Sequence, residues 1–166
     1  KRPASLADAK GAVSGDARFL AGGQSLIQAM KLRLSSSETL VDLGAIGELR
    51  TIRMDGPNLV IGAMATHASV AASAEVRKAC PALAELAGGI GDPMVRNMGT
   101  IGGSIANADP AADYPAAVVG LGATVHTNQR TIAADSFFTG LYETALQPGE
   151  LITAVSFPPV AKAAYM

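Results

Sequence analysis

The glycine pair Gly102-Gly103 constrains the fold of this chain more than any other feature of its sequence. It lies in the stretch Thr100 to Asn107, which leads into the acidic run Ala108 to Tyr114. Two adjacent glycines lack Cβ atoms and accept positive φ, so a bulky ligand can come within hydrogen-bonding distance of successive backbone N–H groups. The stretch therefore predicts either a phosphate-binding turn or a tight turn that is required only for packing.

Another glycine pair lies earlier in the chain, in the stretch Ala21-Gly22-Gly23-Gln24-Ser25, which is called the first glycine stretch below, with Thr100 to Asn107 as the second. Strand-like residues 18–20 precede it, and residues 26–34 follow it with apolar side chains at helical spacing. Ser25 is placed to cap that helix, whose first N–H groups would face the ligand. This order of strand, glycine turn and helix favours phosphate binding at both pairs. Neither pair fits G-x-G-x-x-G and no Gly-Lys-Ser/Thr occurs, which disfavours Rossmann and P-loop folds.

Both stretches resemble the two FAD-pyrophosphate loops of the flavoprotein subunits of molybdenum hydroxylases. The resemblance is carried by Ala21 to Ser25 with Met30 to Leu34, and by the long motif from Arg96 to Ala116. It extends over nearly all of the 166 residues. Members of that family continue beyond the point at which this sequence ends, so we expect their C-terminal domain to be absent. The resemblance implies an FAD cofactor and an electron-transfer function.

The resemblance also implies which residues hold the FAD. Backbone amides of both stretches would bind the pyrophosphate, helped by the hydroxyl groups of Ser25 and Thr100. Asp113 would accept hydrogen bonds from the ribose hydroxyls, and its alternative role is to cap a helix. Asn107 and Asp109 would either reach the cofactor or fix the turn. The implied cofactor-binding set is Ala21, Gly22, Gly23, Gln24, Ser25, Thr100, Ile101, Gly102, Gly103, Ser104, Asn107, Asp109 and Asp113.

By the same resemblance, the partners are a large molybdenum–pterin subunit and a small subunit with two [2Fe-2S] clusters, in a dimer of heterotrimers. Electrons would pass from the molybdenum site through the clusters to FAD and then to an external acceptor. One alternative is a nucleotide-binding or scaffold domain of the same fold without a redox step. Another is a flavin oxidase of the vanillyl-alcohol type, although no His or Cys lies in a flavin-attachment context. No catalytic acid, base or nucleophile is evident from spacing, so the cofactor would supply the redox chemistry.

Composition and charge disfavour several other functions. The net charge is −1 and no basic run occurs, which argues against a nucleic-acid partner. The single cysteine, Cys80, precludes an internal disulfide and cannot by itself ligate an iron–sulfur cluster. His67 and His126 have no further ligand at a suitable spacing, so we expect no metal site. No segment has the roughly 18 apolar residues of a transmembrane helix and no signal peptide is evident, so we expect a cytoplasmic protein.

The pattern of elements predicts an α+β protein of two small α/β lobes. Residues 1–55 would form a parallel βαβ lobe that carries the first glycine stretch and begins with a helix capped by Ser5. Residues 56–166 would form a larger lobe with a mainly antiparallel sheet, flanking helices and the second glycine stretch. The expected elements there are a hairpin turning at 55–58, helices near 66–70, 75–79, 81–87 and 115–121, strands at 124–127 and 130–132, a helical turn at 135–138 and a strand at 151–157.

Overall fold

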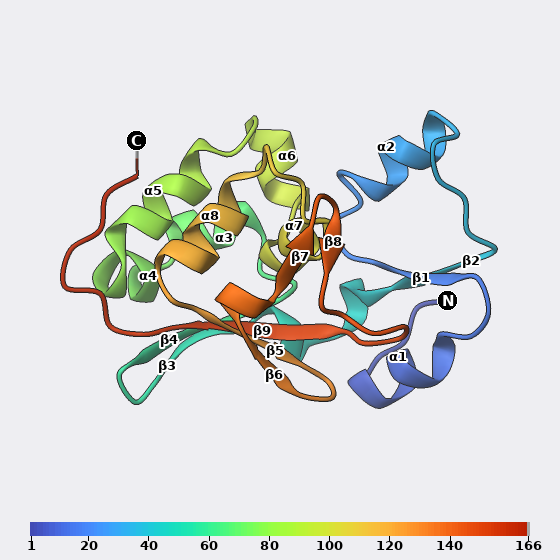
Figure 1. Cartoon of the computed structure of the whole chain (residues 1–166), viewed down its shortest axis with the longest axis horizontal. Coiled ribbons are helices and arrows are strands. Elements are labelled where there is room, and N and C mark those ends of the chain that lie inside the picture. Colours follow the sequence, from blue (N-terminus) through green and yellow to red (C-terminus); the bar gives the residue numbers. More distant parts are fainter. Residues whose placement is uncertain (166) are drawn as a thin grey trace.

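The chain folds into two lobes that lie side by side in a computed structural model describing residues 1–165 (Figure 1). The N-terminal lobe lies at the right of the view. Its strands β1 and β2 pair in parallel, and α2 lies in the connection between them. The predicted parallel βαβ unit is therefore confirmed. This lobe contains α1 (Leu6–Ala12), β1 (Ala17–Leu20), α2 (Leu26–Lys31), β2 (Thr39–Asp42) and the 3₁₀ helices η1 (Leu43–Ala45) and η2 (Gly47–Arg50).

The larger lobe is built on a five-stranded antiparallel sheet with the strand order β3-β4-β9-β5-β6. Its central strand β9 is the last in the sequence, and β9 pairs with β4 on one side and with β5 on the other. Val155 of β9 is fully buried and lies opposite both Ile61 and Val125. The strands are β3 (Ile52–Asp55), β4 (Asn58–Gly62), β5 (Thr124–Thr127), β6 (Thr131–Ala133) and β9 (Ile152–Phe157), and a separate hairpin consists of β7 (Phe138–Gly140) and β8 (Glu143–Thr144).

Short helices cover one face of this sheet (Figure 1). Four of them begin at polar caps, because the side chains of Thr66, Ser73, Asp92 and Thr100 each accept a hydrogen bond from the backbone N–H three residues later. The helices are α3 (His67–Ala72), α4 (Ala74–Ala79), α5 (Pro81–Gly89), α6 (Pro93–Met98), α7 (Ile101–Asn107), α8 (Asp113–Gly120) and the 3₁₀ helix η3 (Ala134–Ser136). The predicted α+β class, with one parallel and one antiparallel sheet, is confirmed.

Two hydrophobic clusters hold the molecule together. The larger one fills the space between the antiparallel sheet and its helices, with Tyr114, Phe137 and Phe157 as its largest fully buried side chains. The smaller one joins the lobes, because it contains Leu43 from the first lobe together with Met64 from the second. The antiparallel sheet begins at Ile52 with β3, which pairs with β4. The lobe boundary expected between residues 55 and 56 therefore falls within the hairpin of β3 and β4.

The structure corrects three local predictions. The second glycine pair lies inside a helix rather than a turn, because the Thr100 hydroxyl accepts from Gly103 N–H at 3.1 Å and starts α7. Ser25 does not cap α2, since its backbone is already helical and its side chain makes no capping bond. Helix α2 ends at Lys31 rather than near Leu34, because Arg33 adopts a positive φ of 58°.

Helix α8 also begins earlier than expected. Asp113 is its first residue, and the capping position is taken by Ala112, which has no side chain able to cap. Asp113 therefore lies within the first helical turn, where a carboxylate still interacts favourably with the helix dipole. The helix predicted to start after Ser5 and to end near Gly15 does begin as expected, since Ser5 Oγ accepts from Asp8 N–H, but it ends at Ala12.

Candidate functional site

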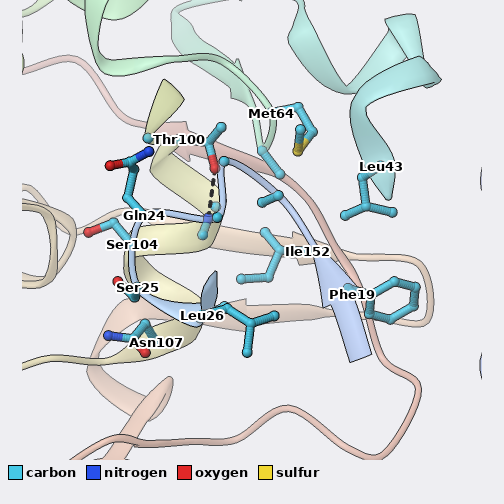
Figure 2. A pocket seen from close by; sticks show the side chains of 18 of the residues that line it. Phe19, Gln24, Ser25, Leu26, Leu43, Met64, Thr100, Ser104, Asn107 and Ile152 are labelled. Carbon is cyan, nitrogen blue, oxygen red and sulfur yellow. Dashed lines mark hydrogen bonds between the residues drawn. The ribbon is translucent and has the colours of Figure 1, made fainter. Parts of the chain in front are cut away.

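A cavity of about 550 Å³ lies between the two lobes. Its walls come from the end of β1, the first glycine stretch, the start of α7 and the start of β9 (Figure 2). Pockets of this size are typical of small-molecule and cofactor sites. The cavity is lined by Arg18, Phe19, Ala21, Gly22, Gly23, Gln24, Ser25, Leu26, Leu43, Ala63, Met64, His67, Ile90, Val95, Gly99, Thr100, Gly102, Gly103, Ser104, Ala106, Asn107, Asp109, Ala112, Leu146, Glu150, Leu151 and Ile152.

The first glycine stretch presents a run of backbone donors to this cavity. Within residues 1–165, the N–H groups from Gly22 to Leu26 have no hydrogen-bond acceptor in the protein. Gly23 adopts a φ of +76°, a conformation that residues with a Cβ rarely adopt. Successive unpaired N–H groups around a residue of positive φ form a concavity that binds anions. This part of the site therefore offers what a phosphate or diphosphate requires.

The second glycine pair has a different physical role. The N–H of Ile101 donates to Ala65 O at 3.1 Å, and that of Gly102 donates to Ala63 O at 2.9 Å. The N–H of Gly103 donates to the Thr100 hydroxyl. These three N–H groups therefore already have hydrogen-bond acceptors within the protein. A Cβ on Gly102 would lie 2.6 Å from the Cβ of Ala63, so this glycine is required for close packing.

The two glycine stretches meet directly. A Cβ on Gly22 would collide with the carbonyl oxygen of Met98 and lie 2.7 Å from its carbonyl carbon. A Cβ on Gly103 would lie 3.3 Å from the Cβ of Ala21. Close approach of the backbones therefore places the donors of the first stretch beside the N-terminal end of α7.

The side chains around the cavity separate by polarity. Gln24 and Ser25 from the first stretch lie on the same side of the cavity as Ser104 and Asn107 from α7, at the left of Figure 2. Ser104 and Asn107 share one face of α7 because they are three residues apart. Phe19 and Leu43 lie at the right of the same view, and Leu26 and Ile152 lie near its centre. The cavity thus has a polar end and an apolar end.

Most of the residues implied by the family resemblance lie together at this cavity. Two do not line it: Ile101 is fully buried in the hydrophobic core, and Asp113 lies at the start of α8. The Asp113 carboxylate accepts a hydrogen bond from the hydroxyl of Tyr165. Asp109 does line the cavity, and its carboxylate also accepts from the N–H of Ala111 at 2.9 Å, which fixes the turn between α7 and α8.

Sequence reasoning missed one of the acidic residues of the cavity wall, Glu150. Glu150 is only 4% exposed, and it accepts hydrogen bonds from Arg130 Nε at 3.0 Å, Thr127 Oγ1 at 2.7 Å and the N–H of Gln147 at 2.8 Å. The hydrogen bond from Arg130 is the main reason that the pKa of Glu150 falls to about 2. The sequence signal for this buried carboxylate was a single charged residue two positions before the apolar strand β9.

His67 was also not expected at the site. It is 5% exposed and lines the cavity, with its ring centroid 5.3 Å from that of Tyr114. Burial lowers the pKa of His67 to about 4, although the Asp113 carboxylate opposes this shift. Burial also raises the pKa of Tyr114. Both rings are therefore uncharged at neutral pH. Separately, residues 1–165 contain no cluster of three or more His, Cys, Asp or Glu that could hold a metal ion.

Comparison with known proteins identifies the family. Residues 1–160 match the family model described as the FAD binding domain in molybdopterin dehydrogenase. The chain belongs to this family. The FAD-binding resemblance inferred from the two glycine stretches is thereby confirmed, and FAD is the cofactor of the family. Within residues 1–165, none of the helices has the length and apolar character needed to cross a membrane.

Relatives with known names are subunits of oxidoreductases. The medium chain of carbon monoxide dehydrogenase from Afipia carboxidovorans is 46% identical over 164 residues, which cover 95% of this chain and 57% of that protein. The nicotine 6-hydroxylase medium subunit of Paenarthrobacter nicotinovorans is 38% identical over 162 residues, covering 94% of this chain and 57% of the relative. The chain thus spans little more than half the length of these relatives.

A solved structure shows the same fold. Carbon monoxide dehydrogenase from Hydrogenophaga pseudoflava, in a form that lacks the Mo-pyranopterin moiety of its molybdenum cofactor, superimposes with a TM-score of 0.92. The sequence identity is 42%, and the match covers 96% of this chain and 58% of the other. The architecture of both lobes is therefore shared with a chain of an enzyme that has a molybdenum cofactor.

Proposed function

We propose that this chain is the FAD-binding part of an electron-transfer subunit in a molybdenum-containing hydroxylase or dehydrogenase. The subunit would accept electrons from [2Fe-2S] clusters and pass them to an external acceptor. It would act with a large molybdenum–pterin subunit and a small iron–sulfur subunit, as a dimer of heterotrimers in the cytoplasm. Relatives named for carbon monoxide and for nicotine are similar in sequence over nearly the whole chain, which supports a role that is common to enzymes with different substrates.

The observation that carries the proposal is the run of unpaired N–H groups from Gly22 to Leu26 at the cavity. A diphosphate brings several acceptor oxygens and negative charge, and backbone donors fixed by the fold bind such a group without a cationic side chain. The hydroxyl groups of Ser25, Thr100 and Ser104 lie at the same cavity and would add donors. The site therefore fits the pyrophosphate of FAD.

Other residues would orient the rest of the cofactor. Asn107 lies on the polar side of the cavity, where its amide would bind the sugar or phosphate (Figure 2). Asp113 would accept from the ribose hydroxyls, which would replace the Tyr165 hydroxyl as its donor. When bound, FAD supplies the ability to take up and release electrons, while the chain supplies binding and orientation. Ile101 would contribute only through the packing of α7.

Reconstitution tests the cofactor part of this proposal. The purified protein is stripped of bound cofactor and titrated with FAD or with FMN, and the released flavin is identified by chromatography. We expect one FAD per chain and much weaker uptake of FMN. Stoichiometric FMN, or no flavin uptake, would contradict the proposal.

Electron transfer needs a second measurement. The FAD-loaded protein is mixed anaerobically with a reduced [2Fe-2S] subunit of the same enzyme class, and flavin absorbance is followed. We expect rapid bleaching only when both proteins are present. Tight FAD binding without reduction would instead favour a nucleotide-binding or scaffold domain that performs no redox step.

A further inference from the structure

His67 lies at the cavity wall but has no part in the cofactor-binding set. It is the first residue of α3, and its side chain is buried. Its ring contacts Gly99, which follows α6, and Tyr114, which belongs to the first turn of α8. This single buried ring therefore connects three helical elements of the larger lobe beside the cavity.

The imidazole takes up the space next to Gly99. The backbones of the two segments are joined, because the N–H of His67 donates to Gly99 O at 3.0 Å and Thr66 forms an antiparallel bridge with Thr100. A Cβ on Gly99 would collide with His67 Nε2 and lie 2.8 Å from Cδ2. Gly99 has a φ of −61°, which residues with a Cβ readily adopt. Glycine is therefore needed at this position to make room for the ring.

The same segment supports the first glycine stretch. A Cβ on Gly22 would lie 2.7 Å from the carbonyl carbon of Met98 and 2.9 Å from the Cα of Gly99. Gly22 begins the run of unpaired N–H groups, and Thr100, directly after Gly99, caps α7. A shift of the Met98-Gly99 segment would therefore move the phosphate-binding donors relative to the start of α7.

We propose that His67 is a positioning residue for the phosphate-binding donors. Its imidazole fixes the Met98-Gly99 segment, and this segment fixes the spacing between the two glycine stretches. The inference rests on the proposed FAD-binding function and adds a residue that acts through the backbone of its neighbours. It assigns no contact between His67 and the cofactor.

The surroundings of the ring indicate which of its properties matters. The rings of His67 and Tyr114 have centroids 5.3 Å apart, and Tyr114 is fully buried. Within residues 1–165, neither His67 Nδ1 nor Tyr114 Oη has a hydrogen-bond partner, although both atoms are buried. An unpaired buried polar atom is destabilising, so Nδ1 does not explain a histidine here. The shape of the ring beside Gly99 is the property that the surrounding backbone uses.

A size exchange between His67 and Gly99 tests this role. His67→Ala removes the ring, and Gly99→Ala adds a methyl group that collides with it. In the double variant the added methyl group enters the space that the ring has left, and its next neighbour, Val95 O, would be 3.2 Å away. Calorimetric titration of the cofactor-stripped proteins gives the dissociation constant of FAD.

We expect each single variant to bind FAD about tenfold more weakly, the effect of losing roughly one hydrogen bond to a charged acceptor. The double variant should bind FAD more tightly than either single variant, because the Met98-Gly99 segment is supported again.

Val125→Ala separates positioning from stability. Val125 is fully buried in the core on β5 and does not line the cavity. Loss of its methyl groups should lower the melting temperature without changing the dissociation constant of FAD. His67→Ala should change both quantities. A residue with a purely structural role would change only the melting temperature, as Val125→Ala does.

Two results would overturn the inference. One is an unchanged FAD affinity in folded His67→Ala. The other is a double variant whose loss of affinity is the sum of the two single losses. Circular dichroism checks folding, and if His67→Ala unfolds, His67→Val replaces it in both the single and the double variant, because valine is also too short to reach Gly99. Wild type that binds no flavin would instead refute the proposed function itself.

Discussion

The buried carboxylate of Glu150 should contribute measurably to the stability of the cavity wall. The variant Glu150→Gln keeps the size of the side chain but removes its charge and turns one acceptor oxygen into an NH₂ group. In the structure, Oε2 accepts from both Arg130 Nη2 at 3.1 Å and the N–H of Gln147 at 2.8 Å. An NH₂ group at the position of Oε2 would therefore face two donors. If the amide is flipped, the NH₂ group takes the position of Oε1, where it would face the donors Thr127 Oγ1 and Arg130 Nε. Neither rotamer satisfies all partners.

The expected cost follows from these contacts. Hydrogen bonds to charged groups contribute about 1.5–3 kcal/mol to stability. The Arg130 side chain is 45% exposed, so water can solvate its freed guanidinium and the cost stays near this range rather than that of a fully buried ion pair. We expect Glu150→Gln to lower the free energy of unfolding by about 2–3 kcal/mol. For a domain of this size the melting temperature should fall by about 4–12 °C.

The pH dependence gives an independent test. The folded state lowers the pKa of Glu150 from 4.5 to about 2, chiefly through the hydrogen bond from Arg130. A carboxylate with a lowered pKa stabilises the fold fully above its unfolded-state value, and this stabilisation is lost as the pH falls from about 4.5 towards 2. Urea unfolding at several pH values should therefore show the gap between wild type and Glu150→Gln narrowing below pH 4.5.

Glu85→Gln is a suitable control, because Glu85 is an exposed residue of α5. It should change the free energy of unfolding very little at any of these pH values. A gap between wild type and Glu150→Gln that is the same at acid and neutral pH would refute the electrostatic reasoning. If Glu150→Gln destabilised the protein no more than Glu85→Gln does, the hydrogen bonds of Glu150 would make no measurable contribution to stability.

Three further predictions concern the site. Gly22→Ala should weaken FAD binding more than tenfold and destabilise the protein by about 1–3 kcal/mol, because its Cβ would collide with Met98, whereas Gly47→Ala, with open space around its Cβ, should do neither. Gly23→Val should abolish flavin binding because valine cannot adopt a φ of +76° without strain, and calorimetry with a native circular dichroism spectrum checks this. Asp113→Asn should weaken FAD binding by about 1–2 kcal/mol, and an unchanged dissociation constant would limit Asp113 to the first turn of α8.

Sequence alone was sufficient for much of the fold because the local signals agreed with one another. Thr66 stands three residues before Ser69 and caps α3 as expected, and the turn at Gly56 joins β3 to β4 in the expected hairpin. The parallel pairing of β1 with β2 followed from the helical segment between them. Element ends were less predictable: Arg33 ends α2 through a positive φ that nothing in its residue type indicates.

The apolar wall of the cavity was beyond sequence reasoning for a different reason. Leu43, Met64 and Leu151 are far apart in the sequence and each reads as an ordinary core residue. They meet because the lobes share a hydrophobic cluster, and only this tertiary contact leaves Phe19 and Leu26 facing a cavity. Local patterns report which residues are apolar, whereas the shape of a cavity depends on how the two sheets are placed.

The two glycine pairs show how one sequence signal can arise from two physical causes. At Gly22-Gly23 the following N–H groups have no partner in the protein and their residues line the cavity, so glycine would allow a ligand to approach and also permits close backbone contact. At Gly102-Gly103 the Thr100 side chain caps a helix, and the N–H groups of residues 101–103 donate to Ala65, Ala63 and Thr100 within the protein. Glycine at position 102 allows the helix to pack closely against Ala63. A Thr three residues before the second glycine of a pair is itself a capping signal, which favours a helix over an open turn. The helix that Thr100 caps carries Ser104 and Asn107 on one face at the cavity. The second glycine pair would therefore contribute to the site through the side chains of α7 and not through its own backbone N–H groups.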